Sequence, residues 1–562
     1  MASRTHKTLV KKTYLAGAMV MLLAVICSTF ANFADVSAEQ ISNEFTNRWG
    51  GSDYDSYLDV AQAKDGGYVA VGNSSSSDGD ADGLGGIDAI ISKYDADGKL
   101  QWEETWGGST DEYFTSVIQM DNGDFVAAGY TNSTINGLQS FGNIDAVLVR
   151  YANDGELVGA INWGGSDGDE FLSVSNTADG GLLAAGISSS PNLDGLTVQN
   201  TDAILVKYDK DGAIEWQQNW GGIINDTFFS AVQTADGGYV AAGLTGPILP
   251  IGLTTHGMMD AMLVKYDADG NMLWQKNWGG AALDYFHSVA EDTDGNIIAV
   301  GESASTDIAG LTNHVNDDEV SEGDAVIVKF NDTGNMLWQK NLGGSSRDLF
   351  NSVALTDDGD YLVAGYAEST DVSGLTSLGN KDAIIAKYDA DGNMLWQKNW
   401  GGSAGDELFS ITPSTMGGYA AVGYSDSVLP NLVDRGAEDA VIIKDNTFYN
   451  VKTTTTEGTV EADTESAVAG DQVKLSITPA PGHYVSTVEF YIAGTDTNIT
   501  DEVKYDAKTS TFLMPASDVD VRVTFTTTNP NTLDQFGTYA IVLIGLFAVV
   551  LVGAKIKTFS RR

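Results

Sequence analysis

Residues 278–342 hold one complete copy of the repeat that decides the fold: WGGAALDYFHSVAEDTDGNIIAVGESASTDIAGLTNHVNDDEVSEGDAVIVKFNDTGNMLWQKNL. The opening Trp-Gly-Gly recurs along the chain, with Leu342-Gly343-Gly344 in one place, and the other copies begin at Trp49, Trp106, Trp163, Trp220 and Trp400. The spacing is 57 or 58 residues everywhere except for a single 64-residue unit. A fixed period of this length indicates a repeat architecture, here with seven units.

Four short β-type runs lie inside each unit. In the quoted copy they are 286–289, 296–301, 325–330 and 336–342, each rich in apolar residues and bounded by Gly, Asp or Asn. Four strands per unit, repeated around a centre, are typical of a β-propeller. The sequence therefore predicts an all-β fold, a seven-bladed β-propeller over residues 39–446.

The last unit predicts how the ring closes. It ends after 440–444 and lacks the Trp-bearing fourth strand, whereas residues 44–49 at the start of the chain align with 272–278. We expect this N-terminal strand to complete the seventh blade, three strands plus one, because an open sheet edge would otherwise be exposed.

The charge balance excludes some partners. Acidic residues number 77 and basic residues 30, for a formal net charge of −47. Such a surface repels phosphate backbones, so nucleic-acid binding is excluded. The one cysteine, Cys27, lies in the apolar N-terminal stretch, which leaves the rest of the chain without disulfides or Cys-bound metal.

Both ends of the chain carry targeting signals. Residues 1–38 combine basic residues, an apolar run from Leu15 to Ile26 and a small-residue site at 36–38, which predicts a secretory signal peptide. Residues 529–562 form a predicted anchor with an uncharged transmembrane helix at 536–554 and a basic tail. We expect the residues between them to lie outside the membrane.

The anchor begins with Asn529, Pro530, Asn531 and Thr532. A motif of this kind before an apolar stretch and a basic tail resembles the sorting signal of Gram-positive wall-anchored proteins. The resemblance implies attachment to peptidoglycan by a sortase, although Leu533 departs from the usual pattern. A plain single-pass membrane anchor is the alternative.

Residues 447–528 follow a different pattern, with Ala-Gly-Asp-Gln-Val at 469–473, Pro-Gly-His-Tyr-Val at 481–485 and Met-Pro-Ala-Ser-Asp-Val at 514–519. These elements resemble the internalin B-repeat type of surface module, which implies a small β-rich stalk. The propeller itself resembles bacterial secreted β-propeller repeat proteins with Trp-Gly-Gly and Asp-Gly-Gly-Tyr elements. That resemblance implies fold and export, and no activity.

Two acidic residues recur in every unit. The first opens the third strand: Asp88, Asp145, Asp202, Asp260, Asp324, Asp382 and Asp439. The second follows the Gly-Gly link: Asp55, Glu112, Asp169, Asp226, Asp284, Asp348 and Asp406. Paired carboxylates can act as acid and base or bind hard cations. Sevenfold repetition favours a structural role, in which each carboxylate accepts backbone N–H groups at a blade junction.

Two loops carry further candidate sites. Asp78, Asp80 and Asp82 alternate around a Gly-containing turn, as in calcium loops, and Asp88 can supply another ligand. The insertion that lengthens one unit is acidic and is the candidate ligand-binding loop, through Asp317, Asp318, Glu319 and Glu322. Calcium is the cofactor that these patterns suggest.

A binding or adhesion module for an extracellular glycan or protein is the function that these features favour. It would be displayed at the membrane or wall surface of a Gram-positive-like cell. An enzyme acting on extracellular polysaccharide and a purely structural envelope protein are the alternatives. The five histidines have no zinc spacing, and no Gly-x-Ser-x-Gly elbow is present, so catalysis is the less favoured class.

Overall fold

The computed structural model describes residues 45–527 except 81–82, 136, 248–251, 315–322, 358, 416–417, 430–431, 434, 446–447, 456, 464–465, 469–471, 496, 501–502 and 516–517. Every regular element in this part of the chain is a β-strand. None of the described residues forms a helix that could span a membrane. The predicted signal peptide, the motif at 529–532 and the helix at 536–554 lie outside the described residues.

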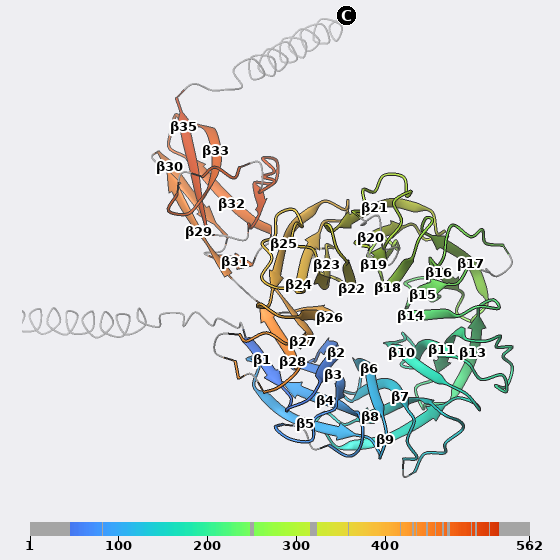
Figure 1. Ribbon diagram of the computed structural model, residues 1–562. Coiled ribbons are helices and arrows are strands. Elements are labelled where there is room, and N and C mark those ends of the chain that lie inside the picture. Colours follow the sequence, from blue (N-terminus) through green and yellow to red (C-terminus); the bar gives the residue numbers. More distant parts are fainter. Residues whose placement is uncertain are drawn as a thin grey trace, which may run out of the picture. The chain divides into compact units, whose positions relative to one another are not determined.

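Six four-stranded antiparallel sheets, numbered here sheets 1 to 6, follow one another along the chain, each built from four consecutive strands. Figure 1 shows them arranged around a common centre. Their strands are β2 (Asp55–Gln62), β3 (Tyr68–Ser74), β4 (Asp88–Tyr94), β5 (Leu100–Trp106); β6 (Glu112–Gln119), β7 (Phe125–Thr131), β8 (Asp145–Tyr151), β9 (Leu157–Trp163); β10 (Asp169–Asn176), β11 (Leu182–Ser188), β12 (Asp202–Tyr208), β13 (Ile214–Trp220); β14 (Asp226–Gln233), β15 (Tyr239–Thr245), β16 (Asp260–Tyr266), β17 (Met272–Trp278); β18 (Asp284–Glu291), β19 (Ile297–Ser303), β20 (Asp324–Phe330), β21 (Met336–Leu342); β22 (Asp348–Leu355), β23 (Tyr361–Ala367), β24 (Asp382–Tyr388) and β25 (Met394–Trp400).

Sheet 7 joins the two ends of this array. It has the order β1-β28-β27-β26, with β1 at Phe45–Trp49, β26 at Asp406–Pro413, β27 at Tyr419–Ser425 and β28 at Asp439–Asp445. Strand β1 runs antiparallel to β28, from Phe45 opposite Lys444 to Trp49 opposite Ala440. The predicted closing strand is therefore confirmed as the fourth strand of this sheet.

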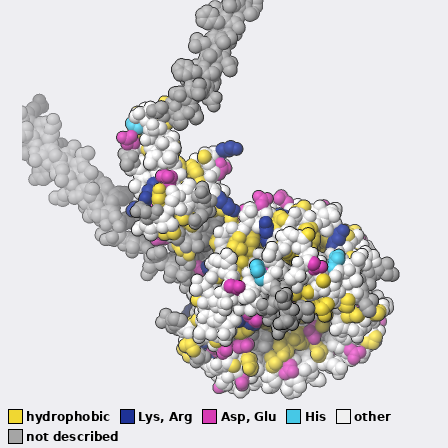
Figure 2. Space-filling view, turned by 45° about the horizontal axis from the view of Figure 1, so that its top comes forward, with side chains coloured by type: hydrophobic (Ala, Val, Ile, Leu, Met, Phe, Trp, Pro, Cys, Tyr) yellow, Lys and Arg dark blue, Asp and Glu magenta, His cyan; other side chains and the backbone are white. Residues whose placement is uncertain are grey.

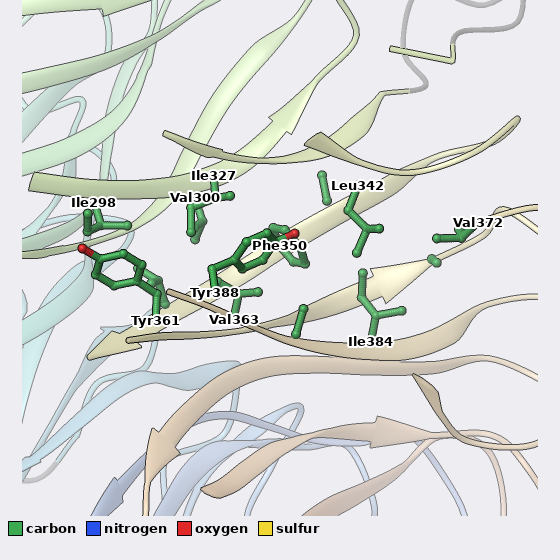
Figure 3. Packing of buried hydrophobic residues seen from close by; sticks show 14 residues of the cluster. Ile298, Val300, Ile327, Leu342, Phe350, Tyr361, Val363, Val372, Ile384 and Tyr388 are labelled. Atoms are coloured by element: carbon green, nitrogen blue, oxygen red, sulfur yellow. The ribbon is translucent and has the colours of Figure 1, made fainter. Parts of the chain in front are cut away.

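Neighbouring sheets bury their faces against each other. The second and third strands of each sheet are apolar and almost entirely buried, as expected for strands covered on both sides. Figure 3 shows one such interface, where Ile298, Val300 and Ile327 of sheet 5 face Phe350 and Tyr388 of sheet 6. The core is thus divided into layers between sheets, and each sheet depends on its neighbours.

The first strand of every sheet lines a central channel and contains a β-bulge. The channel-lining residues at the equivalent bulge position of the seven first strands are Leu58, Thr115, Leu172, Phe229, His287, Asn351 and Phe409. A bulge adds one residue on one strand only, so the inner strands bend where they pass the channel.

Residues 448–526 form two further sheets. The strands are β29 (Phe448–Thr455), β30 (Gly458–Ala462), β31 (Ser466–Val468), β32 (Gln472–Pro479), β33 (Tyr484–Ile492), β34 (Thr511–Leu513) and β35 (Val519–Thr526). The first sheet has the order β31-β29-β35-β33, with β29 and β35 parallel, and the second has the order β30-β32-β34. A separate core that includes Val473, Phe490 and Phe512 holds them together. The resemblance to surface stalk modules stays a prediction.

Candidate functional site

The antiparallel order sorts the connections of sheets 1 to 7 onto two faces. The Trp-Gly-Gly links and the long connections between second and third strands lie on one face, which we name the link face. The short turns, such as 63–67 and 267–271, lie on the opposite face, the turn face. Acidic side chains are spread over the view in Figure 2 between neutral and apolar ones, so charge density alone does not locate a site there.

The acidic residue after each link is a buried structural group. Asp169 accepts hydrogen bonds from the backbone N–H of Gly165, at 2.7 Å, and from the hydroxyls of Ser188 and Ser190. The backbone N–H of the second link glycine makes the same bond in every sheet, at 2.6–2.9 Å, to Asp55, Glu112, Asp226, Asp284, Asp348 and Asp406. These donors hold the buried carboxyl group at each junction, and the structural interpretation of this column is confirmed.

The acidic residue that opens each third strand has a similar role. Asp382 accepts hydrogen bonds from the backbone N–H of Leu378, at 2.7 Å, and from the Asn399 side chain, at 3.1 Å. In sheets 2 to 5 an asparagine of the fourth strand likewise donates a side-chain hydrogen bond, 2.6–3.3 Å long, to the aspartate that opens the third strand of the same sheet. These asparagines are Asn162, Asn219, Asn277 and Asn341. These carboxylates fix the long connections to the sheets.

Asp348 provides a pH-dependent test of this buried column. Burial, together with the nearby Asp324 carboxylate, raises the pKa of Asp348 to about 7. Because the folded-state pKa lies above the ordinary value of 3.8, the stabilising contribution of this group is present at acidic pH and is lost as pH rises through about 7. We expect Asp348→Asn to reduce the fall in unfolding temperature between pH 5 and pH 8.

The measurement is thermal unfolding of the full chain at both pH values. Asp332→Asn, which removes an exposed carboxylate on the turn face, is the matched control and should keep the wild-type pH dependence. An equal pH dependence in all three proteins would contradict the account of Asp348.

The predicted calcium ligands have separate partners. Asp78 accepts a backbone N–H at 2.8 Å, Asp80 forms an ion pair with Arg435, and Asp88 accepts a backbone N–H at 2.7 Å. Asp82 lies outside the described residues, among which no group of three metal-binding side chains is found. Calcium binding therefore stays a prediction. The same holds for the acidic loop, which also lies outside the described residues and comprises Asp317, Asp318, Glu319 and Glu322.

The residues that differ from sheet to sheet gather at the link-face end of the inner strands. The second residue of the inner strand and its cross-strand partner form the pairs Ser56–Asn73, Tyr113–Tyr130, Glu170–Ile187, Thr227–Leu244, Tyr285–Glu302, Leu349–Tyr366 and Glu407–Tyr424. We name this set the mouth. Its composition varies from apolar to charged and aromatic, in contrast with the two repeated acidic columns.

One side of the mouth, in sheets 5 to 7, is a bonded cluster of charged groups and tyrosines. Arg347 donates two hydrogen bonds to Glu302, each 2.7 Å long. The Lys381 ammonium lies 3.1 Å from Glu407 and 4.2 Å from the ring centroid of Tyr366. Glu302, Glu407 and Tyr366 are almost completely buried, so this side of the mouth is rigidly held.

The neighbouring side chains extend this cluster. The Tyr424 hydroxyl lies 3.4 Å from both Lys381 and Glu407, and the Asn351 side chain donates to Glu407 at 3.1 Å. Burial and the Glu407 and Glu438 carboxylates raise the pKa of Tyr424 well above its usual range. The phenol is therefore neutral and acts as a hydrogen-bonding group.

The other side of the mouth that carries aromatic and acidic residues lies in sheets 2 and 3. Tyr113 and Tyr130 stack with their ring centroids 4.8 Å apart. Burial and the charge of Asp169 raise the pKa of the half-buried Glu170 carboxyl. Burial and the charge of Glu170 in turn raise the pKa of Tyr130. Neither group is apparent in the sequence, because its members are far apart in the chain. Alignment of the seven units, followed by a search for positions where charge and aromaticity vary, is the signal that identifies them.

The comparisons with known proteins give distant likenesses. No family model matches the chain. Regulatory protein FlaEY of Caulobacter vibrioides is 23% identical over 397 residues, which are 62% of this chain and 40% of that protein. An uncharacterized WD repeat-containing protein of Acanthamoeba polyphaga mimivirus is 24% identical over 164 residues, 26% of this chain and 12% of that protein. The chain thus spans less than half the length of these curated relatives.

Solved structures also align with the chain, and two of them serve as examples. Sqt1 from Chaetomium thermophilum has a TM-score of 0.38 and 10% identity, and the alignment covers 72% of this chain and 99% of that one. The WD40 domain of Neurospora crassa Pan2 has the same TM-score and identity, with coverage of 72% and 97%. The fold described above rests on the strand pairing of this chain itself.

Proposed function

We propose that the protein is a closed seven-bladed β-propeller displayed on the outside of the cell, where it binds an extracellular protein or glycan at the mouth. The small β-rich domain serves as the stalk, and residues 529–562 anchor the chain to the membrane or the wall. A role in adhesion follows from that placement. The proposal retains the function that the sequence favoured and moves the binding site from the acidic insertion to the mouth.

The composition of the mouth carries this proposal. A position that repeats in every sheet maintains the fold, as the hydrogen bonds of Asp169 and its equivalents do. At the mouth, in contrast, seven equivalent positions hold Ser, Tyr, Glu, Thr, Tyr, Leu and Glu. Blade-specific side chains on a rigid scaffold are a common way to build a binding surface.

Binding is favoured over catalysis by the state of two of the three mouth carboxylates. Glu302 and Glu407 are buried and are each held by a cation, Arg347 and Lys381, at 2.7–3.1 Å. A general acid or base has to exchange a proton with substrate, whereas these carboxylates position the cations. The alternative functions are a polysaccharide-acting enzyme and a structural envelope protein, and the test below distinguishes the proposal from them.

The test is a binding array of extracellular proteins and glycans probed with the full chain and with the double variant Tyr130→Ala/Tyr424→Ala. We expect at least one ligand whose binding is lost in the double variant. Leu273→Ala, an exposed apolar residue on the outer strand of sheet 4, is the control and should bind as the wild type does. Cleavage of an arrayed polysaccharide, or ligand binding unaffected by the double variant, would contradict the proposal.

A further inference from the structure

We propose, building on the proposed function, that the partner enters the mouth with lysine or arginine side chains. The inference names the chemistry of the partner: a basic segment of an extracellular protein. It rests on the charge of the mouth, on the acids that remain without a cation, and on the tyrosine faces beside them.

The mouth carries an excess of negative charge. Among the described residues of the mouth and those directly flanking its strands, Arg347 and Lys381 are the only Lys or Arg residues. Burial lowers the pKa of the adjoining His287 to about 4, so that imidazole is neutral. The carboxylates at the mouth and in the residues flanking its strands are Asp111, Glu170, Glu302, Glu368, Glu407, Asp426 and Glu438. The potential at the mouth therefore favours a positively charged group.

Both resident cations are already committed to resident carboxylates. Arg347 is bound in a bidentate pair to Glu302, and Lys381 lies 3.1 Å from Glu407 and 3.8 Å from Glu368. An anionic ligand would have to compete with these glutamates inside a negative surface. An anionic partner is therefore the less favourable one.

In sheet 7, the negative charges of two acidic residues beside Tyr424 are less fully neutralised by cations than those of Glu302 and Glu407. Ser425 pairs with Asp439 in the register of β27 and β28, so the exposed Asp426 and the half-buried Glu438 flank that pair on neighbouring strands. Burial and the charge of Asp426 raise the pKa of Glu438. The charge of Lys381 partly offsets this effect. Within the part of the chain that the structure describes, neither acid forms an ion pair of its own. A cation supplied from outside would relieve their repulsion.

The tyrosine rings are the second feature, after the carboxylates, that would bind a cationic side chain. Lys381 already shows how this surface holds an ammonium group, with the charge 4.2 Å from the ring centre of Tyr366 and two carboxylates beside it. Tyr424 with the nearby Glu438, and the stacked Tyr113–Tyr130 pair with Glu170 in the next sheet, also bring rings and carboxylates together. Aromatic faces next to carboxylates are suited to lysine and arginine.

The tyrosine–carboxylate group around Tyr130 and the one around Tyr424 lie in different sheets. Their separation indicates that one partner presents more than one cation. One group lies in sheets 2 and 3 and the other in sheet 7, with sheet 1 between them on one side and sheets 4 to 6 on the other. A single side chain can occupy one of them. A basic segment that crosses the mouth can occupy both, and its affinity then gains from two linked contacts.

The experiment measures fluorescence anisotropy of a labelled peptide that carries two lysines separated by a Gly-Ser spacer, added to the full chain. Peptides with two arginines or two glutamines at the same places are the comparison probes. We expect the lysine and arginine peptides to bind at least about tenfold more tightly than the glutamine peptide. Their affinity should fall as salt screens the mouth.

Charge-matched variants separate the mouth from the general acidity of the chain. Asp426→Asn/Glu438→Gln removes two charges at the mouth, and we expect it to weaken binding of the lysine peptide about tenfold. Asp269→Asn/Asp332→Asn removes two exposed charges in turns of the turn face and should change affinity less than about twofold. Thermal unfolding of each variant verifies that the fold is kept, and Tyr424→Leu tests the aromatic face separately.

Two results would overturn the inference: equal binding of the lysine and glutamine peptides, or equal loss of affinity in the mouth variant and the turn-face variant. The second result would show that the peptide follows net charge alone. If an array ligand still depends on Tyr130 and Tyr424 while the lysine peptide fails to bind, the cationic partner is rejected and the proposed function stands.

Discussion

A chain that lacks residues 39–49 should unfold at a clearly lower temperature than the full chain, because sheet 7 loses its fourth strand. Five register pairs between β1 and β28 disappear, and the edge of β28 becomes exposed. Trp49, which is buried in the core between sheets 7 and 1, is lost as well. Thermal unfolding of the truncated protein is the measurement, and an unchanged midpoint would contradict closure by β1.

A single substitution tests the same closure without removing backbone. Arg48 on β1 pairs with Asp439 at 2.9 Å, and its side chain and that of Asp439 are 3% and 0% exposed. Arg48→Ala leaves the buried aspartate without its arginine and should cost about 3–5 kcal/mol of unfolding free energy. Arg150→Ala breaks a partly exposed pair with Asp124 and should cost about 1 kcal/mol or less. Equal losses in the two variants would reject the closing role of Arg48.

Gly243→Ala should be nearly as damaging, for a steric reason. A Cβ added at Gly243 on β15 would lie 1.7 Å from the carbonyl oxygen of Thr227, which belongs to the bulged inner strand β14. The backbone of two paired strands has to separate, and we expect a loss of about 3 kcal/mol or more in denaturant unfolding.

Gly237→Ala in the turn of the same sheet is the matched control. Gly237 has a φ of +86° and nothing within 4 Å of an added Cβ, so the substitution costs only the left-handed conformation, about 1–2 kcal/mol. If Gly243→Ala is no more destabilising than Gly237→Ala, the close approach between β14 and β15 is wrong.

The fold could be predicted from the sequence because its signals are local and repeated. The Trp-Gly-Gly period, the four apolar runs in each unit and the unpaired strand around Trp49 are all visible without a structure. The role of the two acidic columns could also be predicted, because a residue that recurs in every unit is expected to stabilise the fold of that unit. The hydrogen bonds to Asp169 are an example.

The mouth could not be predicted in the same way. Arg347 and Glu302 are 45 residues apart, and Lys381 and Glu407 are 26 apart, in different repeats. Their proximity follows from strand register and from the β-bulges, which depend on backbone geometry that apolar patterning does not encode. The sequence instead drew attention to long loops, where insertions are conspicuous but no bonded cluster is required.

Hydrogen–deuterium exchange of the full chain, with and without the two-lysine peptide, tests most directly the claim that the mouth is the binding surface. The account predicts slower exchange in residues 111–113, 404–407 and 424–427 on the link face, with no change in the turns at 63–67 and 267–271. Protection confined to those turns, with none at the mouth, would contradict it.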